Sequence, residues 1–317
     1  MSSTPLTMPS KNTLQTLLYT AISLGIVAAL IYTVNYAELI ATLKTGNLLL
    51  IAGATLLITT LLPIVFSLRW QQTLHVLGHQ ISLPLLIRLQ LAAFPISKFS
   101  PSNVGDLMKA YYLRQSVPYQ PHMGAIAFER MIDLIILFLF AILGGLLTGN
   151  HAALLLGAGA LAGVLTIFFG VRYISGRTAN RPLIKKIRSF LVVFAQFTDH
   201  PGRALSIISY SLTAWLGIFT YIYVLFLAFG APLSFLDVIA LQPIAITIGL
   251  LPFTLAGIGT REAAMLVLYA PLIAQPATLA TGLVYSVFSS VVLSLVGIPF
   301  LRYAFSNHRP HRVKEIS

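Results

Sequence analysis

Long apolar runs alternate with short polar segments along this chain, and the run lengths set the first expectation. Runs such as Thr16–Val34 and Ala152–Val171 are long enough for a helix to cross a bilayer, which takes about 20 apolar residues. Alternating amphipathic strands are absent, so helices would satisfy the backbone in lipid. The pattern predicts six full spans, near residues 14–34, 47–68, 125–148, 152–172, 204–229 and 277–301.

Two further apolar regions, near residues 83–117 and 236–275, are each interrupted in the middle. The first contains "PISKFSPSNVGD" and the second "LPFTLAGIGTRE". Each region is predicted to form either a re-entrant helical hairpin or a pair of short spans. Two broken segments at corresponding places, entering from opposite faces, predict an inverted repeat with a site near the bilayer midplane. We therefore expect an all-α polytopic membrane bundle of about eight membrane segments, six full and two broken.

Composition supports the assignment to the membrane. Of the 317 residues, 57% are hydrophobic and only 9% are charged, and the mean hydropathy is +0.88, whereas soluble domains carry about 25% charged residues. The chain has no cysteine, which excludes disulfides, thiolate metal sites and cysteine nucleophiles. It also has no Walker A loop or H-E-x-x-H motif, so we expect neither a cofactor nor a metal site.

The basic residues give the expected orientation. The net charge is +12, and the densest basic segment, residues 172–203, contains Asp199 as its single acid. The positive-inside rule places this segment in the cytoplasm and the short uncharged turn at Gly149–His151 outside. Helical spacing of the apolar residues in Pro182–Phe197 allows an interfacial helix against anionic headgroups, but the charges alone would also suffice as a topology signal.

The distribution of basic residues also gives the expected location of the other segments. We expect a cytoplasmic N-terminal tail at residues 1–13, one membrane domain at residues 14–305 that includes the basic loop, and a cytoplasmic C-terminal tail at residues 306–317. The protein is then a multi-pass protein of the bacterial inner membrane. Trp70 and Trp215 are expected in the interfacial aromatic belts.

Acidic residues are few, and several stand where a membrane protein rarely has them. Each charge at bilayer depth costs about 2.5–3.5 kcal/mol on insertion scales, so such residues are usually functional. On a helix Glu129 and Asp133 lie one turn apart, and Arg130 can reach Asp133. They form either a paired, half-solvated helix end or an acidic face that positions Arg130, Lys98 or Lys109 to hold an anion. The acids in or beside apolar segments are Asp106, Glu129, Asp133 and Glu262.

Both breaks have features of an anion site. Gly257 and Gly259 permit tight turns before a helix resumes at Arg261. Free N–H groups at a helix start, with an arginine nearby, suit a phosphate group. The first break offers Ser102 and Asn103 before another helix. Alternatively, the glycines and prolines only kink the helices.

Taken together, three motifs resemble the flippase-like family, which comprises the membrane domains of lysylphosphatidylglycerol synthases and their stand-alone relatives. They are a P-x-x-x-G-D/E…K/R-A stretch, then A-x-x-x-E-R-x-x-D, then "LPFTLAGIGTREAA", and the resemblance spans about residues 15–305. The matching residues are Pro101, Gly105, Asp106, Lys109, Ala110, Glu129, Arg130, Asp133, Pro252, Gly257, Gly259, Arg261 and Glu262.

The resemblance implies translocation of an anionic phospholipid or polyprenyl-linked lipid between leaflets. Because this region takes up most of the 317 residues, the chain has no room for the synthase catalytic domain, and enzymatic activity is not expected. Alternatives are a membrane-embedded lipid-modifying transferase and a non-catalytic partner of one. The expected partners are an anionic lipid, a lipid-modifying enzyme or glycosyltransferase, and a second copy of the chain, but not nucleic acid. The predicted substrate-binding residues are Lys98, Ser102, Asn103, Gly105, Asp106, Lys109, Glu129, Arg130, Asp133, Gly257, Gly259, Arg261 and Glu262.

Overall fold

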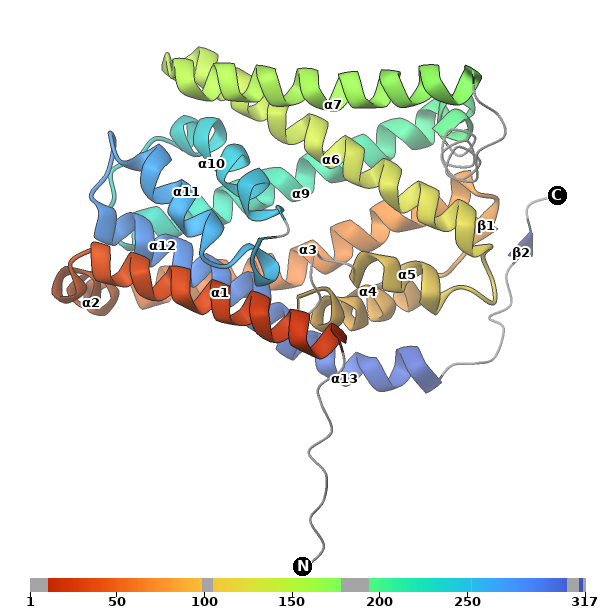
Figure 1. The fold of residues 1–317 in the computed structure, drawn as a ribbon. Helices are drawn as coiled ribbons and strands as arrows, with labels where there is room; N and C mark the ends of the chain where they lie inside the picture. Colours follow the sequence, from red (N-terminus) through yellow and green to blue (C-terminus); the bar gives the residue numbers. More distant parts are fainter. Residues whose placement is uncertain (1–10, 99–104, 178–193, 252, 307–313, 316–317) are drawn as a thin grey trace, which may run out of the picture.

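The computed structural model describes residues 11–98, 105–177, 194–251, 253–306 and 314–315, which form a bundle of helices (Figure 1). The elements are α1 (Lys11–Thr33), α2 (Tyr36–Thr45), α3 (Leu48–Val76), β1 (His79–Gln80), α4 (Leu83–Lys98), α5 (Gly105–Tyr112), α6 (Tyr119–Thr148), α7 (His151–Arg177), α9 (Pro201–Ala228), α10 (Phe235–Gly249), the 3₁₀ turn η2 (Leu255–Gly257), α11 (Thr260–Tyr269), α12 (Gln275–Val287), the π-helical η3 (Phe288–Val292), α13 (Leu293–Ser306) and β2 (Lys314–Glu315).

Five helical stretches in the described chain are long and apolar enough to cross a membrane: α3, α6, most of α7, α9, and the continuous run from α12 through α13. A sixth arises if α1 and α2 are one span, although they are bent by 94°. The bend has a local cause, because the Asn35 side chain accepts a hydrogen bond from the Ala37 N–H and starts a new helix. The protein is therefore an all-α polytopic membrane protein, as predicted, with a sharp bend between α1 and α2.

Both interrupted regions fold as pairs of short helices. α4 packs against α5, with residues 99–104 between them lying outside the described part, and α10 packs against α11. The second pair turns through η2, where Gly257 has a φ of 76°. A Cβ on Gly257 would lie 2.3 Å from the Gly249 carbonyl oxygen, so this close approach requires glycine. The choice between re-entrant hairpins and short spans stays a prediction, as do eight segments in total.

Four helix contacts organise the bundle: α3 with α9, α6 with α7, α6 with α10, and α4 with α13. Small residues allow the backbones to come close, as is common between membrane helices. A Cβ on Gly144 of α6 would lie 2.5 Å from the Ala240 nitrogen of α10. A Cβ on Gly297 of α13 would lie 2.3 Å from the Leu91 carbonyl oxygen of α4.

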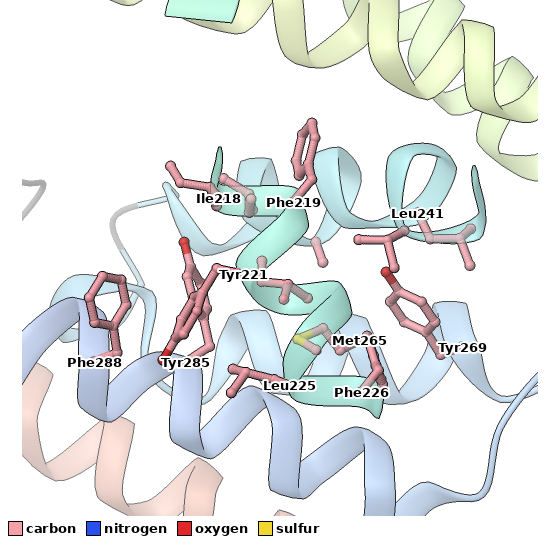
Figure 2. Packing of buried hydrophobic residues seen from close by; sticks show 14 of the residues in the cluster. Ile218, Phe219, Tyr221, Leu225, Phe226, Leu241, Met265, Tyr269, Tyr285 and Phe288 are labelled. Carbon is pink, nitrogen blue, oxygen red and sulfur yellow. The ribbon is translucent and has the colours of Figure 1, made fainter. Parts of the chain in front are cut away.

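Aromatic side chains of α9 pack against aromatic side chains of α11, α12 and η3 in the core of the bundle (Figure 2). On one side Tyr221 lies 4.6 Å from Phe288, centre to centre. On the other, Phe226 lies 5.0 Å from Tyr269 of α11. This packing holds α11 and η3 against α9, and with them the second polar group described below, which lies on α11 and on α12 just before η3.

The cytoplasmic segments predicted from charge are only partly described. Residues 1–10, half of the basic segment (178–193) and residues 307–313 and 316–317 lie outside the described chain. At the C-terminus, β2 pairs in antiparallel fashion with β1, the short strand between α3 and α4.

Candidate functional site

The first polar group is centred on Arg69 of α3, whose side chain is only 1% exposed. Its Nη1 lies 2.7 Å from Asp133 Oδ1 and its Nη2 lies 3.3 Å from Glu129 Oε2, both on α6. As predicted, Glu129 and Asp133 share one helix face, and Arg130 reaches Asp133 Oδ2 at 3.3 Å. Arg130 is 45% exposed, so it contributes to the rim of the group rather than its centre.

Neutral side chains complete this group. The Thr73 hydroxyl donates to Glu129 Oε1. Arg69 Nη1 also donates to the Ser211 hydroxyl at 2.9 Å, and Trp215 Nε1 donates to Asp133 Oδ1 at 3.2 Å. Because Ser211 and Trp215 lie on α9, the group joins three helices that are distant in sequence.

The second polar group lies at the start of α11 and is also buried. Gly259 precedes the helix with a φ of 92°, and its N–H donates to Glu262 Oε2 at 2.6 Å. Arg261 Nη2 lies 3.3 Å from Glu262 Oε1. Gly259 also faces α1, because a Cβ there would lie 3.0 Å from Ile26 Cβ. The glycines thus allow α1 and the α11 N-terminus to meet at a buried ion pair.

α12 holds this ion pair in place. The Ser286 hydroxyl donates to Glu262 Oε1 at 2.5 Å and accepts a hydrogen bond from Arg261 Nη2. The Arg261 guanidinium lies 4.3 Å from the centre of the Tyr285 ring, a cation–π contact. Gly282 makes room, since a Cβ there would lie 3.0 Å from Glu262 Cγ.

Lys109 of α5 is buried near the first group. It is 2% exposed, and its Nζ lies 5.5 Å from the centre of the Trp70 ring. The Trp70 indole N–H donates to His122 Nε2 at 2.8 Å. The expectation that Trp70 lies in an interfacial belt is wrong, because this side chain is fully buried.

Not every predicted site residue can be located. Ser102 and Asn103 lie outside the described residues. Lys98 ends α4, and Gly105 and Asp106 begin α5, but the structure does not describe the Lys98 and Asp106 side chains. The predicted residues with described side chains lie in the two groups, in the turn before α11 in the case of Gly257, or beside Trp70 in the case of Lys109.

Sequence reasoning missed the cation at the centre of the first group. Arg69 directly follows the predicted second span, residues 47–68, but α3 continues to Val76 and keeps Arg69 within the bundle. Two acids at membrane depth require a buried cation. The position of Arg69 at the end of an apolar run was the one sequence feature that could have identified it as that cation. Ser211, Tyr285 and Ser286 gave no such signal.

Comparison with known proteins identifies the family. The family model described as "Lysylphosphatidylglycerol synthase TM region" matches residues 17–297. No curated protein sequence matches the chain. The matched region runs from α1 into α13 and contains both polar groups. The chain therefore belongs to the family of the lysylphosphatidylglycerol synthase TM region.

Proposed function

We propose that the protein is a lipid flippase, which moves an anionic phospholipid or a polyprenyl-linked lipid between the leaflets of the bacterial inner membrane. Membership of a membrane-domain family linked to lipid handling supports this. The observation that carries the proposal is the burial of charged side chains at both Arg69 and Arg261 within an apolar bundle. Charges in such places are rare and mark transport pathways more often than packing.

In this proposal the two broken segments form the headgroup path. α4 of the first segment packs against η2 of the second, and α1 packs against both η2 and α11. Broken backbone at membrane depth suits a polar cavity, where half-helix starts face an anion. The acyl chains would stay in lipid while the headgroup passes. The residues proposed to bind it are those of the two groups with Lys98, Ser102, Asn103, Gly105, Asp106 and Lys109.

The packing also supports the proposed inverted repeat. One correspondence pairs α3 with α9, α4 with α10, α5 with α11, and α6 with the α12–α13 run. Under it, the contact of α4 with α13 corresponds to that of α10 with α6, and the contact of α4 with α5 corresponds to that of α10 with α11. Likewise, the contact of α5 with α6 corresponds to the contact of α11 with α12. The contact of α3 with α4 corresponds to the contact of α9 with α10. Each polar group would then serve one half of an alternating-access cycle.

Leaflet exchange in liposomes tests the function. Purified protein is reconstituted with fluorescent phosphatidylglycerol, and a membrane-impermeant quencher reports the lipid in the outer leaflet. We expect exchange faster than in protein-free liposomes. Exchange no faster than in protein-free liposomes, together with turnover in detergent when a soluble group donor is added, would indicate a transferase instead.

A further inference from the structure

The hydrogen bond between Trp70 and His122 leaves a buried donor without an acceptor. The Trp70 indole can only donate, and it donates to His122 Nε2, so the His122 ring is neutral and carries its hydrogen on Nδ1. His122 is fully buried, and this Nδ1 has no hydrogen-bond partner in the described chain. Because a buried N–H without an acceptor is costly and rare, it marks a place where an acceptor from outside the described residues can bind.

Positive charge next to this donor favours an anionic acceptor. The buried Lys109 of α5 lies over the Trp70 ring, with its Nζ 5.5 Å from the ring centre. Lys109 and His79 both lie close enough to His122 to act on it electrostatically. His79, on β1, has a buried Nδ1 that also lacks a hydrogen-bond partner among the described residues. A negatively charged oxygen is therefore a better acceptor here than a neutral one, because a charged partner strengthens the hydrogen bond.

Three acids of the chain bear on this place. Glu129 follows His122 by seven residues, about 10 Å along α6, and it is already engaged by Arg69 and Thr73. Glu315 stands opposite His79 in the β1–β2 pair, and Asp106 precedes Lys109 on α5. The side chains of Glu315 and Asp106 lie outside the described part, so the experiment below includes both acids as competitors for the site.

We propose that Lys109 and His122 form a phosphate-binding site, in which a phosphate oxygen accepts the His122 Nδ1 hydrogen and the Lys109 ammonium offsets its charge. His79 lies at the edge of the site and can supply a further hydrogen bond. Because both main donors are buried, a phosphate reaches them only when α5 moves away from α6. The site continues the first polar group by two helical turns toward the start of α6. As a place where the lipid headgroup is held, the site rests on the proposed function, whereas phosphate binding itself does not.

Tryptophan fluorescence of the purified protein in detergent tests the site, because Trp70 is hydrogen-bonded to His122 and lies beside Lys109. The chain has two tryptophans, so the variant Trp215→Phe assigns the emission to Trp70. Inorganic phosphate and dihexanoylphosphatidylglycerol are titrated separately, with sodium chloride at equal ionic strength as the control. We expect a saturable change with at least one of the two ligands. A change that does not saturate, or that equals the change with sodium chloride, would overturn the site and leave water as the acceptor.

Two substitutions test the donors. Lys109→Met removes the charge, and His122→Gln removes the Nδ1 hydrogen but keeps an acceptor for the Trp70 N–H. Each should weaken binding by at least about tenfold, as expected for a hydrogen bond that involves a charged group. The matched controls Lys44→Met and His151→Gln change exposed residues and should leave binding unchanged. Binding in Lys109→Met and His122→Gln as tight as in these controls would overturn the site.

If neither variant folds, the wild type labelled with ¹⁵N-histidine decides. Phosphate should shift the resonance of a histidine that is protonated at Nδ1 and unprotonated at Nε2, and the absence of any such shift would overturn the site. Binding in Asp106→Asn or Glu315→Gln but not in the wild type would also overturn it, because a carboxylate of the chain would then fill the place.

The two ligands separate the site from the proposed function. Binding of inorganic phosphate without binding of the phosphatidylglycerol would support the phosphate site and overturn its role in holding the headgroup. Binding of the phosphatidylglycerol by a protein that gives no leaflet exchange would support the site and count against the flippase function alone.

Discussion

Arg69 pairs with two carboxylates inside the bundle, so its removal takes their buried ion-pair partner from Glu129 and Asp133. Breaking a buried ion pair typically costs about 3–5 kcal/mol. We expect Arg69→Met to lower the free energy of unfolding in detergent by about that amount. The triple variant Arg69→Met/Glu129→Gln/Asp133→Asn should regain most of the loss. Arg88→Met is the matched control, because Arg88 is exposed on α4 and its guanidinium lies over the Tyr303 ring. Equal losses in Arg69→Met and the control would contradict the role of Arg69.

Substitutions of Arg261 can distinguish a role in lipid binding from a purely structural role. A lysine keeps the charge but loses the planar fork that reaches both Glu262 and Ser286. We expect Arg261→Lys to slow lipid transport with a nearly unchanged folded yield. Arg261→Ala should abolish transport and lower the yield, because Glu262 then lacks its cation. In Arg261→Ala/Glu262→Gln the yield should recover and transport should not; recovery of both would make Arg261 purely structural.

At the scale of elements, the turn between α10 and α11 depends on Gly257. Alanine there would need a φ of 76° and would place its Cβ 2.3 Å from the Gly249 carbonyl oxygen. We expect Gly257→Ala to reduce both thermal stability and transport. Gly159→Ala is the control, because this helical glycine of α7 has no atom within 4 Å of its Cβ position and should gain about 0.5–1 kcal/mol. If the Gly257→Ala protein were as stable as this control, the close approach of Gly257 to the Gly249 carbonyl would be contradicted.

Helices and breaks could be predicted from the sequence where a single property, such as hydrophobicity or glycine content, determines them. The spans follow from apolar runs, and the break before Arg261 follows from its glycines. The bend at Asn35 was missed because a capping side chain inside an apolar run changes hydropathy very little. The Arg69 group was missed because a single sequence shows that buried acids need a cation but not which distant helix supplies it. Ser286 is a further case, since a serine is unremarkable in a membrane helix until the fold places it between Arg261 and Glu262.

For the whole molecule, the charge bias predicts the orientation of every span. The chain has no cysteine, so single cysteines can be introduced without background labelling. With a membrane-impermeant thiol reagent on intact cells, we expect labelling of His151→Cys, at the exposed start of α7. Lys185→Cys and Ser306→Cys should label only after the membrane is permeabilised. Labelling of Lys185→Cys in intact cells would reverse the orientation and remove the argument for opposed broken segments.

The most direct test of the account is the selectivity of leaflet exchange in proteoliposomes. Fluorescent phosphatidylglycerol and fluorescent phosphatidylcholine are compared at equal protein density, with wild type and Arg261→Lys side by side. Buried arginines that recognise an anionic headgroup predict faster exchange of phosphatidylglycerol, and a loss of that preference in Arg261→Lys. Equal rates for the two lipids in the wild type, unchanged by Arg261→Lys, would contradict a headgroup site built on these charges.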